Sequence, residues 1–535
     1  MAKKITPLIG IISMDVSEEN GCIVAAGRCV VKMQGGKGKT DTSDIRLDIP
    51  FKEDAVKISF GSRYGRRLPG GFELNTYRIA ADIEEAKDFD IQNKLMPVYR
   101  DSDPGRILYS VFDLKKGRNH NSKIVLSGDK AIYFRQNIHN TLNLTVREAN
   151  QYDTPEGQKR LADAEKRAKA LKGSDIILMY EKNCSRYEES ASVLYEKLID
   201  AGHDNVYFIT DTSIPAVQAL DEKYKKNLIE KDSDRHLEYF FACEKFISSE
   251  TIDHALQLRV ASKAVQDKIT GKGLSYVFLQ HGVMYMVSLN SKLRVGFRQK
   301  KGYKLHRTVV SSEAEARHFI DMADMSRDDL YITGLASFDT SYRHDDADRI
   351  IIMPTWRRWE ANQAEKDVEQ TGYFRMLCRM YDAVPDELKD RVIILPHPLI
   401  ADLFKDEKEG IGSHILMADS YDKVFRDCDL LITDYSSIAY DAFYRGANVV
   451  FDWQDLDDCM EHYGEGTRLM LNDDNVFGRV CRSPEELKKA VAETYGKPQR
   501  EGDIERYRKI VEFHDGKNSE RIIENLIKDG MIERK

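Results

Sequence analysis

The stretch LITDYSSIAYDAFYRG, residues 431–446, joins an apolar run to a segment of helical character that ends at a glycine. The apolar run predicts a buried strand, and the residues after it predict a helix ending before Gly446, a suitable C′ residue. Asp434, Ser436 and Ser437 crowd the junction, although a helix cap needs only one of them. Helix N-termini expose free N–H groups and the positive end of the helix dipole. The junction therefore predicts a phosphate site at Ser436 and Ser437, with plain capping of the helix as the alternative.

From Ser174 onward, short apolar runs alternate with stretches of helical character. This alternation predicts parallel sheets with helices on both faces. The acidic turn at 344–349 divides the runs into two series, so we expect two doubly wound Rossmann-like domains, over 174–343 and 344–535. The expected strands are 175–180, 205–210, 245–249, 276–280, 307–312 and 330–334 in the first series, and IIIMP (350–354), VIILP (392–396), HILMA (414–418), LLITD (430–434) and NVVFD (448–452) in the second.

The N-terminal part differs in character. Residues 1–150 carry short runs with alternating or β-branched residues, which predict a β-rich, sandwich-like domain. Residues 151–173, QYDTPEGQKRLADAEKRAKALKG, are rich in alanine, lysine and glutamate and end at a glycine, so they predict a linker helix. The apolar face of this helix holds only alanines and two leucines, which favours a solvated spacer over a membrane anchor.

The composition is that of a globular protein with more than one core: 535 residues, 41% hydrophobic and 32% charged. A net charge of −8 argues against nucleic-acid binding. No apolar run is long enough to span a bilayer, and the N-terminus is expected to be a strand rather than a signal peptide, so we expect a cytoplasmic protein. The eight cysteines are scattered and the acidic turns lack matching ligands, so neither a metal nor a cofactor is expected.

Two histidines follow expected strands. Ligands of doubly wound sheets bind beyond the carboxyl ends of the strands, so both histidines are candidates for a cleft. His281 precedes Gly282 and is the candidate general base, with a strand-end histidine bonded to a carbonyl as the alternative. His397 lies between Pro396 and Pro398, which fix the chain and leave the ring projecting. Its ring is a candidate to donate a hydrogen bond to a phosphate oxygen or to stabilise a leaving group. The alternative is a simple turn residue.

Charged residues near other strand ends add to this set. Arg357 and Arg358 follow IIIMP and offer guanidinium forks to a phosphate, with a solvated loop pair as the alternative. Asp441 lies one helical turn after Ser437 and either orients a neighbouring group or lies on the surface.

One segment has a strongly basic character. KLRVGFRQKKGYKLHR, residues 292–307, contains seven lysines or arginines and no acid. Its side chains Arg298, Lys300, Lys301 and Lys304 are candidates for contact with an anionic acceptor chain or with anionic lipid. A solvated basic loop is the alternative, and the absence of a compensating acid favours the functional interpretation.

The order and spacing of several motifs, across roughly residues 245–452, resemble those of the CDP-glycerol glycerophosphotransferases, enzymes of teichoic acid and related cell-surface polymer synthesis. The matching pieces are QHG (280–282), TGLASFD (333–339), PTWR (354–357), PHP (396–398) and TDYSSIAYDAF (433–443). The resemblance implies a GT-B fold of two Rossmann-like halves. It also implies transfer of a polyol phosphate, glycerol phosphate first, from a CDP-linked donor to a polymer hydroxyl, with release of CMP.

The same resemblance implies roles for single residues. His281 is then the base on the acceptor hydroxyl, and His397, Ser436 and Ser437 hold the donor diphosphate, with Arg357 and Asp441 beside them. The implied partners are CDP-glycerol or another CDP-polyol such as CDP-ribitol, and an anionic lipid-linked polymer reached from the inner face of the cell membrane. No metal is required.

Two other functions remain open at this point. A GT-B glycosyltransferase with a nucleotide-sugar donor would use the same fold and phosphate cradle. A non-catalytic polymer-binding protein would use the β-rich domain as its binding module. Such a protein would tolerate loss of His281 and His397, and the presence of both favours an enzyme.

Overall fold

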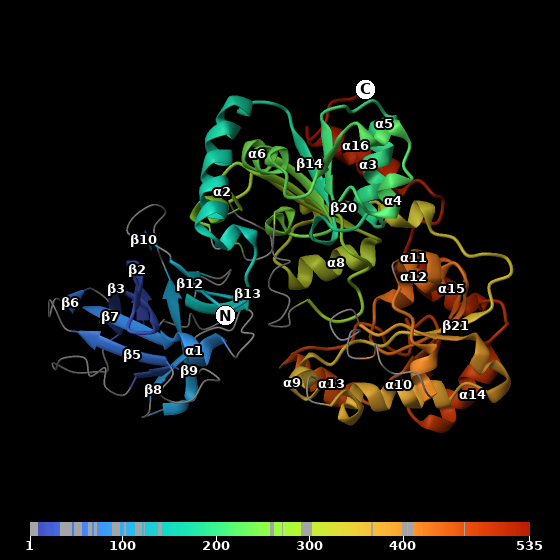
Figure 1. Cartoon of the computed structure of the whole chain (residues 1–535). Coiled ribbons are helices and arrows are strands. Elements are labelled where there is room, and N and C mark those ends of the chain that lie inside the picture. The colour runs from blue at the N-terminus through green and yellow to red at the C-terminus, as the bar shows by residue number, and fades with distance from the viewer. Residues whose placement is uncertain are drawn as a thin grey trace. The chain divides into compact units, whose positions relative to one another are not determined.

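A computed structural model of the chain divides into two compact units (Figure 1). The N-terminal unit is Met1–Arg167 with Arg259–Ile269, and the C-terminal unit is Ala168–Leu258 with Thr270–Lys535. Among the described residues, no helix has both the length and the apolar character needed to cross a bilayer. The structure describes residues 9–32, 45–47, 56–61, 67–68, 72–87, 97–100, 103–112, 120–121, 123–136, 142–256, 260, 262–269, 271–289, 302–364, 367–397, 404, 410–418, 420–464 and 466–535.

The N-terminal unit is β-rich, as the sequence predicts. Strands β3 (Cys22–Lys32) and β7 (Phe72–Asp82) pair antiparallel over their full length, and the alternating burial along β7 shows one face turned to a core. A second sheet, β11 (Ile124–Ser127), β12 (Lys130–Gln136) and β13 (Leu142–Glu148), supplies the other side of that same core, which makes the unit sandwich-like. The remaining elements are β1 (Ile9–Ile11), β2 (Met14–Glu19), β4 (Ile45–Leu47), β5 (Val56–Gly61), β6 (Arg67–Leu68), α1 (Ile83–Lys87), β8 (Pro97–Arg100), β9 (Asp103–Phe112), β10 (His120–Asn121) and α7 (Lys263–Ile269).

The expected linker helix forms as α2 (Pro155–Ala168). It is not a fully solvated spacer, because Leu161 and Ala164 on it are completely buried. A buried ion pair between Arg147 Nη1 and Asp153 Oδ2, 2.6 Å apart, joins the end of β13 to the turn before the helix. The start of the linker is therefore fixed to the β-rich unit.

The C-terminal unit begins with a parallel sheet in the order β16-β15-β14-β17-β18-β19-β20. Its first strand lies in the middle, and the chain order reverses between β14 and β17, where doubly wound sheets bind ligands. Edge strand β16 was not expected from the sequence. The strands are β14 (Ile177–Tyr180), β15 (Val206–Thr210), β16 (Leu228–Glu230), β17 (Lys245–Ser248), β18 (Ser275–Phe278), β19 (Leu305–Val310) and β20 (Leu330–Ile332).

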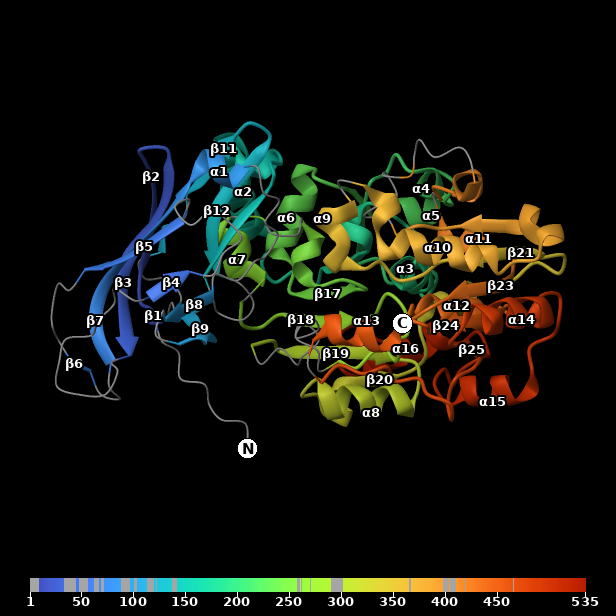
Figure 2. The ribbon, with the colours of Figure 1, turned by 90° about the horizontal axis from the view of Figure 1, so that it is seen from below.

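A second parallel sheet follows in the order β22-β21-β23-β24-β25, with its reversal between β21 and β23. Figure 2 labels β21, β23, β24 and β25 of this sheet. The two predicted doubly wound sheets are therefore confirmed. The prediction of a strand at HILMA is wrong, because that segment makes only an isolated bridge from Ile415 to Ile394. Edge strand β25 was not expected from the sequence. The strands are β21 (Arg349–Ile352), β22 (Val392–Ile394), β23 (Cys428–Thr433), β24 (Asn448–Asp452) and β25 (Arg479–Cys481).

The second sheet is buried on both faces, which explains why its strands are continuous apolar runs. On β21, Ile350 and Ile352 face one hydrophobic core and Ile351 faces another. The core around Ile351 continues into the first sheet, so one hydrophobic interior joins the two sheets. The main helices of this unit are α3 (Ser190–Asp200), α4 (Pro215–Gln218), α5 (Glu222–Lys225), α6 (Asp234–Ala242), α8 (Glu313–Met322), α9 (Ala361–Ala364), α10 (Gly372–Asp382), α11 (Tyr421–Phe425), α12 (Ile438–Tyr444), α13 (Leu456–Tyr463), α14 (Pro484–Thr494), α15 (Glu501–Arg508) and α16 (Asn518–Lys528).

The last helix, α16, returns to the first sheet, where it packs against α3 (Figure 1). The boundary expected at residue 343 is therefore crossed once by the C-terminal helix. Asp339 of the GLASFD motif fixes this return, because its carboxylate accepts hydrogen bonds from the backbone N–H groups of Asn518 and Ser519, at 2.8 and 2.7 Å. This part of the motif serves the fold.

Candidate active site

The QHG motif forms a strained turn directly after β18. Gln280 has a φ of 64° although it is not glycine, and its buried amide donates a hydrogen bond to the carbonyl of Val309. This backbone conformation is held by its surroundings and places His281 at the strand end, with 47% of its side chain exposed. His281 therefore lies where a candidate base can reach a substrate.

His281 has an acidic partner that the sequence analysis did not identify. Its Nδ1 lies 3.3 Å from Oε2 of Glu189, the residue before α3. Lys182 Nζ lies 2.6 Å from the other oxygen of Glu189, and Ser249 donates to Oε2 at 3.0 Å. Burial opposes ionisation of Glu189, but the contacts with His281 and Lys182 outweigh it and hold the pKa of this carboxyl well below its ordinary value.

The DYSS segment of the second sheet forms the expected strand-to-helix junction. Helix α12 begins at Ile438, and Ser437 is its N-cap residue without a side-chain capping bond. Ser436 Oγ accepts a long hydrogen bond of 3.5 Å from the N–H of Ile438. The helix ends as predicted, since Gly446 has a φ of 100° and its N–H bonds to the carbonyl of Phe443. Ser437 is exposed and Ser436 partly exposed, so both hydroxyls are accessible.

The QHG turn and the DYSS helix meet in space. A Cβ atom on Gly282 would lie 3.7 Å from Asp441 Oδ2 and 3.9 Å from Ser437 Oγ, so the glycine keeps room beside both polar groups. Burial raises the pKa of the Asp441 carboxyl to about 7. Asp441 is therefore neither a simple surface residue nor a fixed negative charge at neutral pH.

Two hydrogen bonds join the segment after the QHG turn to residues near the second sheet. The N–H of Met470 donates to the carbonyl of Met286 at 2.8 Å, and the Tyr440 hydroxyl donates to the carbonyl of Tyr285 at 3.1 Å. Tyr285 and Met286 lie three and four residues after Gly282, so the chain that leaves the QHG turn is attached to α12 and to the segment before β25. The juxtaposition of Gly282 with Ser437 is thus built into the fold.

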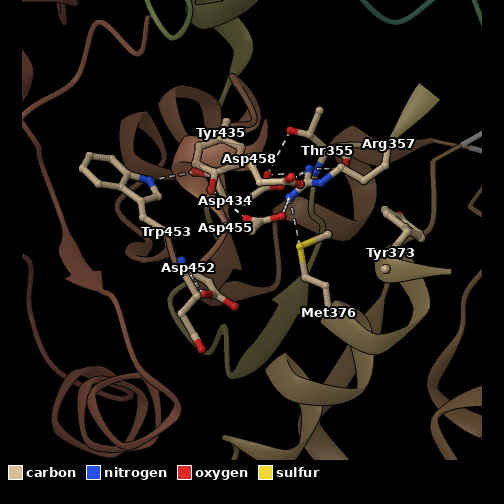
Figure 3. Close-up of polar contacts among 12 residues, drawn as sticks. Thr355, Arg357, Tyr373, Met376, Asp434, Tyr435, Asp452, Trp453, Asp455 and Asp458 are labelled. Atoms are coloured by element: carbon tan, nitrogen blue, oxygen red, sulfur yellow. Dashed lines mark hydrogen bonds and ion pairs between the residues drawn. The ribbon is translucent and has the colours of Figure 1, made fainter. Parts of the chain in front are cut away.

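Arg357 lies under the DYSS turn rather than open to a ligand (Figure 3). Its side chain is 3% exposed, and its two terminal nitrogens lie 2.7 Å from Asp434 Oδ2 and 2.8 Å from Asp455 Oδ2. Asp434 Oδ1 also accepts from the backbone N–H and the hydroxyl of Thr355, at 2.8 and 2.9 Å. The predicted phosphate contact of Arg357 stays a prediction, but the observed contacts make this residue a clamp between the loops after β21 and β23.

His397 follows β22, beside β21 in the second sheet, and its N–H donates to the Tyr373 hydroxyl at 3.2 Å. The loop therefore lies at the same sheet edge as the DYSS turn, and the predicted role of the His397 ring stays a prediction. Of the basic segment, Arg298, Lys300 and Lys301 lie outside the described residues. Lys304 is exposed just before β19.

The residues missed by the sequence analysis share a recognisable signal. Glu181 and Lys182 directly follow the expected strand 175–180, and Glu189 directly precedes the next helix. His281 became a candidate because it directly follows an expected strand. The same criterion, applied to the strand 175–180, identifies Glu181 and Lys182 as candidates too.

The chain is similar to several known proteins. The sequence model of CDP-glycerol:poly(glycerophosphate) glycerophosphotransferase matches residues 165–528. The minor teichoic acid biosynthesis protein GgaB of Bacillus subtilis (strain 168) is 25% identical over 192 residues, which are 33% of this chain and 21% of GgaB, so the match spans about a fifth of that protein. Among solved structures, the wall teichoic acid polymerase TagF superposes with a TM-score of 0.49 at 16% identity, covering 70% of this chain and 93% of TagF. The glycosyltransferase WaaG, involved in lipopolysaccharide biosynthesis, superposes with a TM-score of 0.34 at 11% identity, covering 65% of this chain and 99% of WaaG.

The family match covers well over half of the 535 residues and includes every motif on which the resemblance rested. The family predicted from those motifs is thereby confirmed. This chain belongs to the CDP-glycerol:poly(glycerophosphate) glycerophosphotransferase family.

Proposed function

We propose that this chain transfers glycerol phosphate from CDP-glycerol to a hydroxyl group of a cell-surface polymer or its lipid-linked precursor, with release of CMP. The observation that carries the proposal is the meeting of the QHG turn with the DYSS helix at Gly282. The residue next to Gly282 is the half-exposed His281, which could take a proton, and the nearby hydroxyl of Ser437 could hold a phosphate, so this meeting supports the proposal. Family membership supplies the donor class that fits this arrangement.

In the proposed reaction, the acceptor hydroxyl oxygen attacks the phosphorus that carries glycerol. The new P–O bond forms as the bond from that phosphorus to the bridging oxygen of the diphosphate breaks, and CMP leaves with the bonding electrons. The hydroxyl proton passes to Nε2 of His281. Such transfers depend mainly on positioning and on stabilisation of the charge on the phosphoryl oxygens.

The donor diphosphate is proposed to lie at the carboxyl edge of the second sheet. The hydroxyls of Ser436 and Ser437 are accessible there, and His397 follows a neighbouring strand of the same sheet. Hydroxyl and imidazole donors fixed by strand ends and a helix start can stabilise the developing charge without reorganising. Arg357 contributes by holding the loops in place, since both of its terminal nitrogens are engaged by aspartates.

Measurement of CMP release from a panel of CDP-linked donors tests the proposal. With a synthetic glycerol-phosphate acceptor, we expect turnover of CDP-glycerol that requires the acceptor, and slower or no turnover of CDP-ribitol. Preference for CDP-ribitol would change the polyol but keep the reaction. Turnover of UDP- or CMP-sugars with silence toward every CDP-polyol would identify a glycosyltransferase, and silence toward all donors despite tight polymer binding would indicate a binding protein.

Contact with the membrane is a further part of the proposal. The basic segment 292–307 has no acidic residue, and a local cluster of this kind attracts anionic lipid. In a flotation assay with vesicles containing anionic lipid, we expect Lys300→Glu with Lys301→Glu to lower the bound fraction at low salt. Neutral vesicles are the control. Equal binding of the variant and the unchanged protein to anionic vesicles would argue against membrane contact through Lys300 and Lys301.

A further inference from the structure

Glu189 occupies the N-cap position of α3 but does not cap this helix. The carboxylate of Glu181 takes that role, because it accepts hydrogen bonds from the backbone N–H groups of Glu188, Glu189 and Ser192. A second carboxylate is therefore not needed to satisfy the free N–H groups at the start of α3. The side chain of Glu189 makes no capping hydrogen bond and contacts other residues instead.

Those partners come from three different strand ends of the first sheet. Lys182 follows β14, Ser249 follows β17 and His281 follows β18, and all three contact the Glu189 carboxylate at 2.6 to 3.3 Å. The order reversal of this sheet lies between β14 and β17, where a doubly wound sheet binds its ligand. The Glu189 carboxylate is thus fixed from several sides at the ligand-binding edge.

The contact also assigns the state of the histidine ring. A carboxylate oxygen only accepts, so Nδ1 of His281 must carry the hydrogen. In a neutral ring, Nε2 then holds the free lone pair and can accept a proton. In water the two neutral forms interconvert, and a fixed acceptor on one nitrogen selects the form that is useful to a base.

We propose that Glu189 is a positioning residue for His281: its carboxylate holds the Nδ1–H, orients the ring and keeps Nε2 free for the acceptor hydroxyl. The inference rests on the proposed function, in which His281 is the base. Lys182 fixes the other oxygen of the carboxylate, so the assembly of lysine, glutamate and histidine is ordered before substrate binds.

Other charged groups also face this assembly. Glu181 comes from the segment after β14, Glu250 from the segment after β17, and Asp441 from α12 beside the second sheet. Glu250 is paired with His254 at 3.1 Å, and contacts with His254 hold the pKa of the Glu250 carboxyl below its ordinary value despite burial. When the charge of Glu189 is removed, these groups still contribute to the electrostatic field at His281.

The first test is Glu189→Gln, which keeps the size of the side chain and removes its charge. We expect kcat for acceptor-dependent CMP release to fall about 10²-fold with little change in KM for CDP-glycerol. A loss confined to kcat, with KM for CDP-glycerol kept, separates a positioning role from a purely structural one. The matched control is Glu188→Gln at the adjacent position, where the carboxylate pairs with Arg186 and not with His281.

Coupling decides whether Glu189 acts through the histidine. In the His281→Ala background, Glu189→Gln should cost nothing further, since the group it positions is gone. An unchanged kcat in Glu189→Gln, or a full 10²-fold loss that persists in the His281→Ala background, would overturn the proposal. Melting temperatures of all variants show whether each is folded.

A spectroscopic test needs no substrate and separates the two proposals. In ¹⁵N-histidine spectra of the full chain, with the His281 signal assigned by its loss in His281→Ala, we expect the neutral ring to carry its hydrogen on Nδ1. A ring with its hydrogen on Nε2 would overturn the positioning role even if the enzyme is active. Absence of turnover with every CDP-polyol, together with an Nδ1–H ring, would instead refute the proposed function.

Discussion

His281→Ala lowers the rate of acceptor-dependent CMP release by about 10³-fold at saturating CDP-glycerol, the middle of the range for loss of a general base. The reason is the position of the ring: it follows β18, is half exposed, and lies next to the glycine that faces Ser437. Donor binding should be retained, because the donor diphosphate is proposed to lie on the second sheet. The checks are kcat from CMP release and the Kd for CDP-glycerol from calorimetry.

A matched histidine is available as a control. His344 is 44% exposed and its Nδ1 lies 2.8 Å from the carboxylate of Asp427, which precedes β23, so it reproduces the exposure and the acidic partner of His281 away from the carboxyl ends of the strands. His344→Ala should leave kcat within about twofold, as expected for a surface substitution. Equal rate losses in the two variants would show that the effect is not specific to the site. An unchanged rate in His281→Ala would remove it as the base.

Much of the fold followed from sequence because its signals are local. Continuous apolar runs predicted strands that the structure buries on both faces, as Ile350, Ile351 and Ile352 illustrate. The errors also have local causes. HILMA has a strand-like composition, yet Ile415 forms only one bridge, because propensity cannot show whether a neighbouring strand is available. Edge strands β16 and β25 are three residues long and each contains a charged residue, Glu230 and Arg479, so neither gives the continuous apolar run by which the other strands were found.

The candidate site was only half predictable for the same reason. His281, Ser436 and Ser437 could be found because each follows an apolar run within a few residues. Glu189 could not be assigned to His281, since 92 residues separate them and the contact depends on the order of strands in the sheet. The role of Arg357 was hidden in the same way. Its sequence position suggested a phosphate fork, while its partners Asp434 and Asp455 lie 77 and 98 residues away.

Arg357→Met should lower the free energy of unfolding of the part that contains the second sheet by about 3–5 kcal/mol, the usual cost of removing one partner from a buried ion pair. Asp434 is completely buried, and the substitution leaves its charge without the guanidinium (Figure 3). The measurement is urea unfolding followed by tryptophan fluorescence. All three tryptophans, Trp356, Trp359 and Trp453, report on this region, and the indole N–H of Trp453 donates to the carbonyl of Asp434.

Two further variants separate the buried charge from other effects of the substitution. Adding Asp434→Asn to Arg357→Met removes the orphaned charge and should recover part of the lost stability, since a buried neutral group costs less than a buried ion. Arg479→Met breaks a pair with Glu493 in which both side chains are more than 40% exposed, and should cost less than about 1 kcal/mol. If Arg357→Met cost no more than Arg479→Met, Arg357 would not be a clamp, and its predicted contact with the donor phosphate would again be the better explanation. If the clamp is real, the loops after β21 and β23 loosen together, so the surviving folded enzyme should also show a raised KM for CDP-glycerol.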